Sequence, residues 1–362
     1  MCQASRLKRG FDTYVSHYAD EGTLFDSKVE LVERRNNDPN LPSHTEPEVL
    51  ARHRHRFPNA TVALLPDHVH CAAFNNKATA YSIAKKAGVP TPARFECADT
   101  DELGAKLDES GSERFVIKLL TGNSSKGVFY ADSPAGAVSR VARLIAEYEL
   151  AEDRLPQVEE FVEGEGWGSS VLYWEGQQIA GFTHRRLREK IATGGTSTLR
   201  EAASHPEMEA ATQRLFSHVG WHGLAMAEYK VCPRTGKFWF IEVNPRLWGS
   251  LPLAVAAGVE FPYLAYLCAT KGPDEAHSYA EARTSALGWR NRWLLGDFTV
   301  ALADLARFRF GRSMSTLFGA KANATDDWFW DDPLVFPGEA LRYISGALAN
   351  RSLNAAEEGM IR

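Results

Sequence analysis

Aromatic and aliphatic residues fill the segment 238–244, where the only polar side chains, Glu242 and Asn244, stand two positions apart. Side chains alternate between the two faces of a strand, so both oxygen-bearing residues are expected on one face, with Ile241 and Val243 on the other. The preceding segment 224–231 has a similar strand character, and Arg234-Thr-Gly236 predicts a tight hairpin with Gly236 in the left-handed conformation. In this hairpin Glu228 is expected directly opposite Glu242.

Other parts of the chain alternate between strand-like and helical patterns. Strands are predicted at 114–120 and 157–162, and a hairpin at 169–174 and 178–183 turns across Glu175-Gly176. Helices are predicted from Asn75 or Asn76 to 87, after Ser133-Pro134, and from Ser204 to Gly220. Further helical patterns occupy 298–308 and 339–348, so strands and helices are mixed throughout.

Length and charge restrict the classes of protein to consider. A chain of 362 residues is expected to form two or three domains, and a net charge of −5 gives no support to a nucleic-acid or membrane-surface role. The apolar stretch 251–270 is interrupted by Pro252, Glu260 and Pro262, which is unusual for a membrane span. Five scattered cysteines without a Cys-x-x-Cys pair suggest neither disulfides nor a zinc site, so a cytoplasmic setting is expected.

The predicted hairpin concentrates the first candidate chemistry. Glu228, Glu242 and Asn244 supply three oxygen ligands from adjacent strands, which suits a hard cation such as Mg²⁺ that also binds the phosphates of a nucleotide. An acidic hairpin exposed to solvent is the alternative interpretation of the same residues.

Two lysines and a glycine-rich loop provide candidate phosphate ligands. Lys77 stands in the first turn of a predicted helix, where the helix dipole disfavours a cation unless an anion is close; an exposed lysine that reaches solvent is the alternative. Lys118 interrupts an apolar strand and needs a partner or an anion if it is buried. The loop that follows, 121–128, has the glycine and serine content of a flap over phosphates, although it is no Walker A loop, and flexible turns share this composition.

Two further segments have a composition suited to ligands. The strand 157–162 runs into Gly164-Glu-Gly-Trp-Gly168, which is typical either of a nucleotide-binding edge or of a plain connector. The segment 184–190 is the most basic in an acidic chain, which favours a small anionic ligand; a solvated basic strand is the alternative. Arg186 and Arg188 are expected on one face of that strand.

Taken in order, these features resemble the ATP-grasp enzymes over roughly residues 75–272. The resemblance depends on a lysine at a strand end, a glycine and serine flap, Val158-Glu-Glu-Phe-Val-Glu-Gly164, and Glu228 followed by Glu242-Val-Asn-Pro-Arg246. The branch that is most similar is that of the carboxylate–amine ligases, with D-aspartate-ligase-like and carbamoyl-phosphate-synthetase-like domains.

This resemblance implies a role for each matching residue. Glu228, Glu242 and Asn244 would bind Mg²⁺ or Mn²⁺, with two metal ions expected, and Arg246 would steady the transferred phosphoryl group. Apart from the resemblance, the dense positive charge of this segment leads us to expect the acceptor carboxylate at Arg186 and Arg188. The residues implied in ATP binding are Lys77, Lys118, Gly122, Ser124, Ser125 and Gly127 for the phosphates, Glu159, Glu160 and Val162 for adenine, and Glu165, or alternatively Glu163, for ribose.

The implied fold is of the α+β class, an ATP-grasp fold in which two α+β subdomains clasp the nucleotide. A shortened Rossmann-like domain is expected at 1–98, the small subdomain with the flap at 99–165, the large subdomain with the metal site at 166–272, and a helical extension at 273–362. The extension is interpreted as a cap, with a partner-binding surface as the alternative.

The implied activity is ATP-dependent ligation of a small carboxylate to an amine, or to a thiol, through an acyl phosphate. No nucleic acid or membrane is expected as a partner, and a homodimer is possible in such a protein. Two other functions fit the same motifs: a nucleotide-binding regulatory protein without turnover, and an ATP-grasp kinase that phosphorylates a hydroxyl group.

Overall fold

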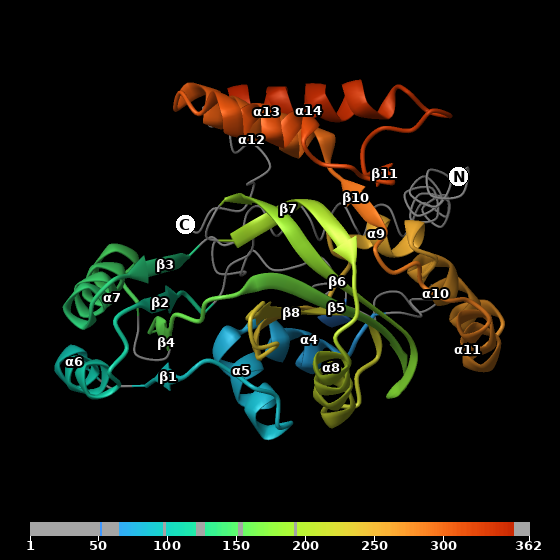
Figure 1. Cartoon of the computed structure of the whole chain (residues 1–362). Helices are drawn as coiled ribbons and strands as arrows, with labels where there is room; N and C mark the ends of the chain where they lie inside the picture. The colour runs from blue at the N-terminus through green and yellow to red at the C-terminus, as the bar shows by residue number, and fades with distance from the viewer. Residues whose placement is uncertain are drawn as a thin grey trace.

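The structure of the chain is a computed structural model that describes residues 51–52, 65–96, 99–120, 127–150, 155–191 and 194–350, with the backbone alone at 190–191, 194–196 and 346–350. Two β-sheets lie side by side, a small one at one end of the molecule and a large one that forms its centre (Figure 1). The predicted α+β class is confirmed. Of the predicted domain at 1–98, only two short parts lie within the described residues, so its shortened form stays a prediction.

The small sheet has the strand order β1-β4-β2-β3, with every neighbouring pair antiparallel. Helices α6 and α7 pack on it, and their apolar stripes form a core with Phe115, Ile117 and Val158. Ser133 caps α7 through Gly136 N, and Pro134 occupies the first turn, as the sequence predicted. The elements are β1 (Arg94–Phe95), α6 (Thr100–Glu109), β2 (Phe115–Lys118), β3 (Val128–Ala131), α7 (Pro134–Tyr148) and β4 (Gln157–Glu160).

The large sheet has the order β11-β10-β7-β6-β5-β8-β9, and a meander of long antiparallel strands forms its middle. The predicted turn at Glu175-Gly176 joins β5 to β6 with positive φ at both residues, as a two-residue hairpin requires. Its strands are β5 (Glu165–Trp174), β6 (Gln177–Ile191), β7 (Gly194–Ala202), β8 (Gly223–Val231), β9 (Phe238–Asn244), β10 (Arg290–Arg292) and β11 (Ala324–Thr325).

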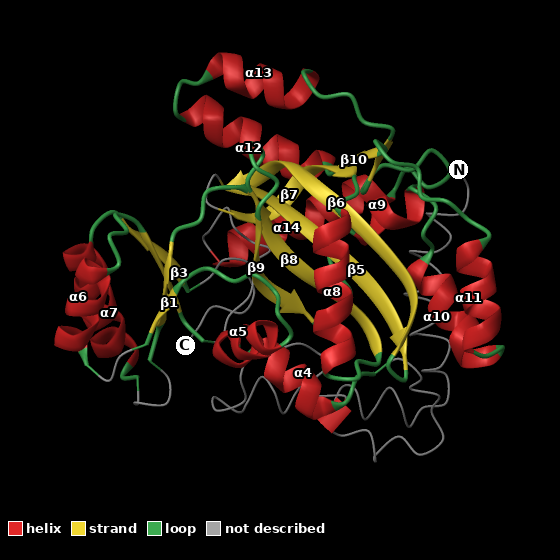
Figure 2. Cartoon of the chain, turned by 60° about the horizontal axis from the view of Figure 1, so that its bottom comes forward, coloured by secondary structure: helices red, strands yellow, loops and turns green. Residues whose placement is uncertain are grey.

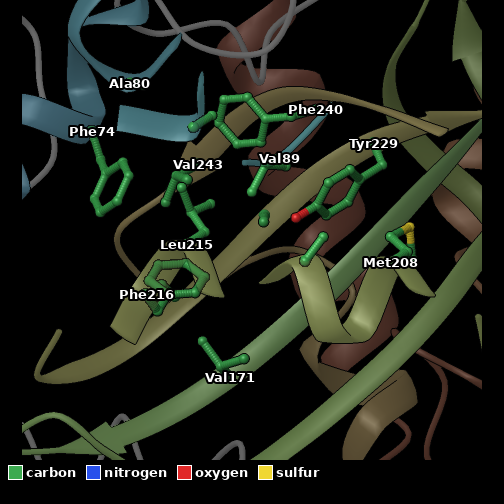
Figure 3. Close-up of a cluster of buried hydrophobic side chains, with 14 of the residues drawn as sticks. Phe74, Ala80, Val89, Val171, Met208, Leu215, Phe216, Tyr229, Phe240 and Val243 are labelled. Carbon is green, nitrogen blue, oxygen red and sulfur yellow. The ribbon is translucent and has the colours of Figure 1, made fainter. Parts of the chain in front are cut away.

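Helices cover both faces of this sheet (Figure 2). On one face α4, α5 and α8 enclose a core that contains Phe74, Phe216 and Trp221 together with side chains of β8 and β9 (Figure 3). On the other face α9, α10 and α11 enclose a second core around Trp248 and Phe261. These helices are α4 (His68–Asn75), α5 (Lys77–Lys86), α8 (Pro206–His218), α9 (Leu251–Ala256), α10 (Phe261–Thr270) and α11 (Pro273–Glu281).

Two local predictions on this part of the chain need correction. The cap of α8 is His205, whose ring accepts from Met208 N, and not Ser204. In β9, Phe238, Phe240 and Val243 belong to the core, whereas Ile241 does not. A β-bulge between Glu228 and Tyr229 shifts the pairing by one residue, so the simple alternation assumed from the sequence changes phase inside the strand.

The C-terminal extension is not wholly helical, which corrects the prediction from the sequence. Strands β10 and β11 extend the large sheet beyond β7, and three helices form a separate layer above them (Figure 1). These helices are α12 (Leu294–Ala306), α13 (Phe310–Phe318) and α14 (Val335–Asn350). Among the described residues no helix combines the length and hydropathy that crossing a membrane requires.

Candidate active site

Glu228 and Glu242 are direct partners in the antiparallel pairing of β8 and β9, as the hairpin pattern predicted. Gly236 has a φ of +71° in the connecting loop, also as predicted, and the bulge next to Glu228 brings the two glutamates into register. Asn244 lies on the same face, because its Nδ2 donates a hydrogen bond of 2.8 Å to Oε1 of Glu228. The three predicted oxygen ligands therefore lie together.

Glu242 is the centre of a small network of charges. Burial raises the pKa of Glu242 above the ordinary glutamate value, and the neighbouring charge of Glu228 raises it further. Lys77, Lys118 and Arg186 act in the opposite direction from three other elements. Two acidic and three basic side chains, far apart in the sequence, thus converge at the end of β9.

Lys77 approaches this group from the first turn of α5. Asn76 caps the helix by accepting from Ala78 N and Thr79 N, and Lys77 N donates to the carbonyl of Leu120, two residues beyond β2. The lysine side chain is buried, and burial lowers its pKa, with a further lowering by Lys118. A buried lysine in a first helical turn, beside a second lysine, is suited to bind an anion.

Lys118 lies at the end of β2 and forms a 2.5 Å ion pair with Glu159 on the adjacent strand β4. Gln157 donates a hydrogen bond to the other carboxylate oxygen of Glu159, and all three side chains are buried. The sequence prediction placed Lys118 at the phosphates and Glu159 at adenine. The structure pairs the two side chains with each other, so the Glu159 carboxylate is engaged within the protein, and both ligand roles stay predictions.

Arg186 extends from β6 across β5 to Glu228 on β8. Its Nη2 lies 2.6 Å from Oε2 of Glu228, and its Nη1 lies 3.4 Å from Oε1 of Glu189. Burial disfavours the guanidinium charge, but these two carboxylates outweigh the effect and raise the pKa of Arg186. Arg186 therefore holds one of the two candidate metal-binding carboxylates in place.

Two glycines in β5 make this crossing possible. A Cβ atom on Gly166 would lie 2.7 Å from Oε1 of Glu189 and 3.0 Å from Cδ of Arg186. A Cβ atom on Gly168 would collide with Cε1 of His184. The glycine-rich segment, predicted as a nucleotide edge or connector, is thus partly a strand whose missing side chains leave room for residues of β6.

His184 and Arg200 lie beside Arg186, and neither was singled out from the sequence. His184 is fully buried, and neither ring nitrogen has a hydrogen-bond partner among the described residues. Burial lowers the pKa of His184 well below its ordinary value, and Arg186 and Arg200 add to this, so the imidazole is neutral. Burial likewise lowers the pKa of Arg200 to about 10, and its guanidinium pairs with Asp326 of the C-terminal extension.

Arg188 does not share the surroundings of Arg186, contrary to the sequence prediction. A bulge in the pairing of β6 with β7 separates the two arginines. The Nη2 of Arg188 lies 2.6 Å from Oδ2 of Asp297 in α12, and Nη1 donates to the carbonyl of Thr316 in α13. Arg188 therefore attaches the C-terminal helices to the sheet, a role that an arginine in a basic run does not reveal.

The remaining predicted residues, where described, make other contacts or are exposed. Glu160 accepts from Ala93 N, and Val162 is half-buried just after β4. Glu163 and Glu165 are exposed before and at the start of β5, and Arg246 is half-buried with Nη1 donating to the carbonyl of Leu247. Gly127 lies immediately before β3 with a φ of +71°. Gly122, Ser124 and Ser125 lie outside the described residues.

The donor set fits a hard cation bound jointly by protein and nucleotide. Glu242 and Glu228 repel each other in a buried setting, and a cation between them would relieve that repulsion. Within the described part of the chain, no three His, Cys, Asp or Glu residues gather as a metal cluster. A cation here would need Asn244 and phosphate oxygens to complete its shell, as Mg²⁺ in nucleotide sites commonly does.

Comparison with known proteins gives matches over this part of the chain. Residues 177–269 match the family described as "Carbamoyl-phosphate synthase L chain, ATP binding domain". Acetyl-CoA carboxylase 2 of Oryza sativa subsp. japonica is 38% identical over 63 residues, 17% of this chain and 3% of that protein. Acetyl-CoA carboxylase of Schizosaccharomyces pombe is 35% identical over 79 residues, 22% of this chain and 4% of that protein. The matches therefore span only a small part of these long relatives.

Two solved structures share the fold at low sequence identity. The biotin carboxylase domain dimer of the Hydrogenobacter thermophilus 2-oxoglutarate carboxylase, in complex with MgADP, ADP and bicarbonate, superposes with a TM-score of 0.51 and 19% identity. That match covers 61% of this chain and 51% of the other. Rhizobium etli pyruvate carboxylase gives a TM-score of 0.53 and 19% identity, covering 68% of this chain and 22% of the other.

The two sheets, the carboxylate hairpin of β8 and β9 and these matches together define an ATP-grasp fold. The fold is that of the ATP-grasp enzymes, as the motifs predicted, and residues 177–269 are similar to the ATP-binding domain of the carbamoyl-phosphate synthase L chain.

Proposed function

We propose that this chain is an ATP- and magnesium-dependent ligase that joins a small carboxylate to an amine and releases ADP and phosphate. The observation that carries the proposal is the convergence of Lys77 and Lys118 with Glu228, Glu242 and Asn244. Catalysis of phosphoryl transfer depends mainly on positioning and charge neutralisation, and this group offers anion-binding and cation-binding side chains within one site.

The lysines are proposed to bind the phosphates of ATP. Lys77 is buried and lies between the positive charge of Lys118 and the negative charges of Glu242 and Glu159. An incoming polyphosphate would favour the charged form of this lysine. Lys118 keeps its position through Glu159, so its ammonium group is held in place before a nucleotide arrives.

Glu228, Glu242 and Asn244 are proposed to hold Mg²⁺, with Mn²⁺ as a substitute and a second ion also allowed by the number of oxygens. The ion, when bound, would neutralise charge on the β- and γ-phosphates. Arg186 acts as a positioning residue, because it engages one oxygen of Glu228 and restricts the orientation of that carboxylate. Arg246, just beyond Asn244, is proposed to steady the transferred phosphoryl group.

The chemical step balances without an enzyme nucleophile. A carboxylate oxygen of the substrate forms a bond to the γ-phosphorus while the bond to the bridging oxygen of ADP breaks. The amine then attacks the carbonyl carbon, the bond from that carbon to the phosphate-bearing oxygen breaks, and phosphate leaves with the former carboxylate oxygen and takes up the proton that the amine loses. The acceptor is proposed to lie on the β6 side, near the buried cations Arg186 and Arg200 and the neutral His184.

The test is isotopic. The chain would be incubated with Mg-ATP and panels of ¹⁸O-labelled small carboxylates and amines, with ADP release measured and products identified by mass spectrometry. The proposal expects substrate-dependent ADP and one labelled oxygen in the released phosphate. Label retained wholly in a stable phosphorylated product would identify a kinase instead, and ATP binding without any turnover would indicate a regulatory protein.

A further inference from the structure

Helix α13 has its polar and apolar faces reversed relative to a normal surface helix. Ser313 and Thr316 are 0% and 4% exposed, whereas Phe318 is 79% exposed and Phe310 and Met314 also face outward. A surface helix ordinarily buries its apolar stripe. An apolar stripe on the outer side of a helix indicates a surface that binds a partner molecule.

Helix α12 shows the same reversal for a visible reason. Asp297 and Asp304 are buried, while Phe298 and Leu302 are exposed. Asp297 faces inward because Arg188 and Arg292 both pair with it. The arginine anchors therefore fix the polar side of the helix toward the protein and leave the apolar side outside.

Helix α14 and the loop before it continue the apolar surface. The rings of Phe298 and Phe336 lie 6.4 Å apart, and Trp328 packs against both Phe336 and Trp330. Trp330 is 88% exposed. We name the outward side chains of α12, α13, α14 and this loop the helical face: Phe298, Leu302, Phe308, Phe310, Met314, Phe318, Trp330, Leu334, Leu341 and Ile344.

The helical face has opposite charges at its two ends. At the turn between α12 and α13, Arg307 is exposed beside Phe308. The exposed Arg309 and Arg312 both pair with Asp304 of α12, at 3.9 and 3.3 Å, which leaves this end with a net positive charge. At the other end, Asp331 is exposed next to Trp330. The α12–α13 turn lies at the end of the layer remote from β10 in both views, and remote from β11 in Figure 1 (Figures 1 and 2). The length of α12 separates the two ends by roughly 15–20 Å.

We propose that the helical face binds the helical face of a second copy of this chain, in a two-fold symmetric dimer. In such an interface each contact occurs twice, so the arginine turn of one copy can meet the Trp330–Asp331 loop of the other. Five exposed aromatic side chains of about 150–250 Å² each, with five aliphatic ones, can supply the roughly 800 Å² per partner of a stable interface.

A membrane is the other partner to which such a surface is suited, and the charges argue against it. Arginines with phenylalanines favour an anionic bilayer, but the acidic Trp330–Asp331 end would then be pressed onto the same negative surface. A second copy in antiparallel orientation brings the net positive end of one copy next to the acidic end of the other. The proposal is independent of the ligase activity.

The first test measures association of the full chain by sedimentation velocity over a concentration series. Wild type is expected to dimerise, and Phe308→Glu with Phe318→Glu should weaken dimerisation by roughly thirtyfold or more, the scale of losing two aromatic contacts. Val69→Glu is the matched control, because Val69 is an exposed apolar residue on α4, on the opposite side of the large sheet. It should leave dimerisation unchanged. Circular dichroism confirms that each variant is folded.

The second test examines the orientation by charge exchange. Arg307→Glu and Asp331→Arg should each weaken the dimer, and a chain with both changes should recover it, since the two ends meet across the two-fold axis. Failure of the recovery would overturn the antiparallel arrangement. A wild-type chain that stays monomeric would overturn the dimer. The same holds for a monomeric chain that cosediments with phosphatidylserine vesicles but not with neutral ones.

Discussion

Lys118 and Glu159 form an ion pair of 2.5 Å across strands β2 and β4, with both side chains buried. Gln157 completes the hydrogen bonding of the carboxylate, and Lys118 also lies within electrostatic range of Lys77 and Glu242. One lysine thus stabilises the small sheet and contributes charge to the proposed phosphate site. Its two roles need to be separated in any mutational test.

Lys118→Met is expected to lower the free energy of unfolding by about 3 kcal/mol or more, because it leaves Glu159 buried without its cation. Lys118→Met together with Glu159→Gln should recover most of that loss, since the pair is then replaced by neutral groups. Urea denaturation of the single and double variants measures both values. Equal stability of the single variant and wild type would mean that the pair is solvated.

In the folded double variant, ATP binding reports the phosphate role of Lys118 alone. Its affinity is expected to fall roughly tenfold to a hundredfold, the scale of one lost charge-assisted contact. Isothermal titration with Mg-ATP measures the affinity, and Glu159→Gln alone is the control. If the double variant binds ATP as well as this control does, Lys118 is no phosphate ligand.

Gly166→Ala is expected to disturb the candidate active site more than a glycine-to-alanine change at an ordinary strand position would. The new Cβ would meet Glu189 and Arg186 at 2.7 and 3.0 Å, so Arg186 must move away from Glu228. The proposed turnover should fall by roughly tenfold or more, through misplacement of a metal-binding carboxylate. ADP release under saturating substrates measures this.

Gly311→Ala is the control for that substitution. A Cβ atom added at Gly311, in α13, would meet no other atom within 4 Å, so alanine there should raise stability by a few tenths of a kcal/mol and leave ADP release unchanged. Unaltered turnover in Gly166→Ala would show that the crossing of Arg186 over β5 is not needed for activity.

Arg188→Ala is expected to act on the C-terminal helices and not on substrate binding. It removes one of the two arginines that pair with buried Asp297, which should cost about 1–3 kcal/mol. Hydrogen exchange should increase in α12 and α13, while the KM values for ATP and carboxylate change alike. Arg185→Ala, which removes a more exposed pair with Glu201, is the matched control. A selective rise of the carboxylate KM would restore Arg188 to the acceptor site.

Local signals were enough to predict most elements and the carboxylate hairpin. Turn glycines, capping residues and strand patterns act over a few positions, so Asn76, Ser133 and Gly236 were interpreted correctly. The register of Glu228 with Glu242 was also predicted, although by a route that omitted the bulge. Bulges depend on packing across strands, which a single strand pattern does not contain.

The partners of charged residues could not be predicted, because they come from distant parts of the chain. Lys118 and Glu159 are 41 positions apart, and Arg188 and Asp297 are 109 apart. A strand pattern predicts which face a side chain takes, not which opposite charge meets it. The glycines at 166 and 168 were a usable signal, since glycine inside a strand often marks a close approach by another group.

Glu242→Gln is expected to stabilise the ligand-free protein at neutral pH. Burial and Glu228 raise the pKa of Glu242, so the folded protein binds this proton more tightly than the unfolded chain does. The contribution of Glu242 to stability is therefore full below the ordinary glutamate pKa and is lost as the pH rises through the folded-state pKa. Glutamine does not ionise, so the Glu242→Gln variant should be more stable than wild type at neutral pH and equally stable near pH 4.

The same substitution should depress turnover by roughly a hundredfold or more while ATP still binds, because a metal-binding carboxylate acts most strongly on the charge of the transition state. Thermal unfolding with and without Mg²⁺ separates the two effects. Mg²⁺ should raise the stability of wild type toward that of Glu242→Gln, and Glu163→Gln, at an exposed carboxylate, should follow wild type throughout. A stability gap that Mg²⁺ does not narrow would show that no cation binds between Glu228 and Glu242, whatever the effect on turnover.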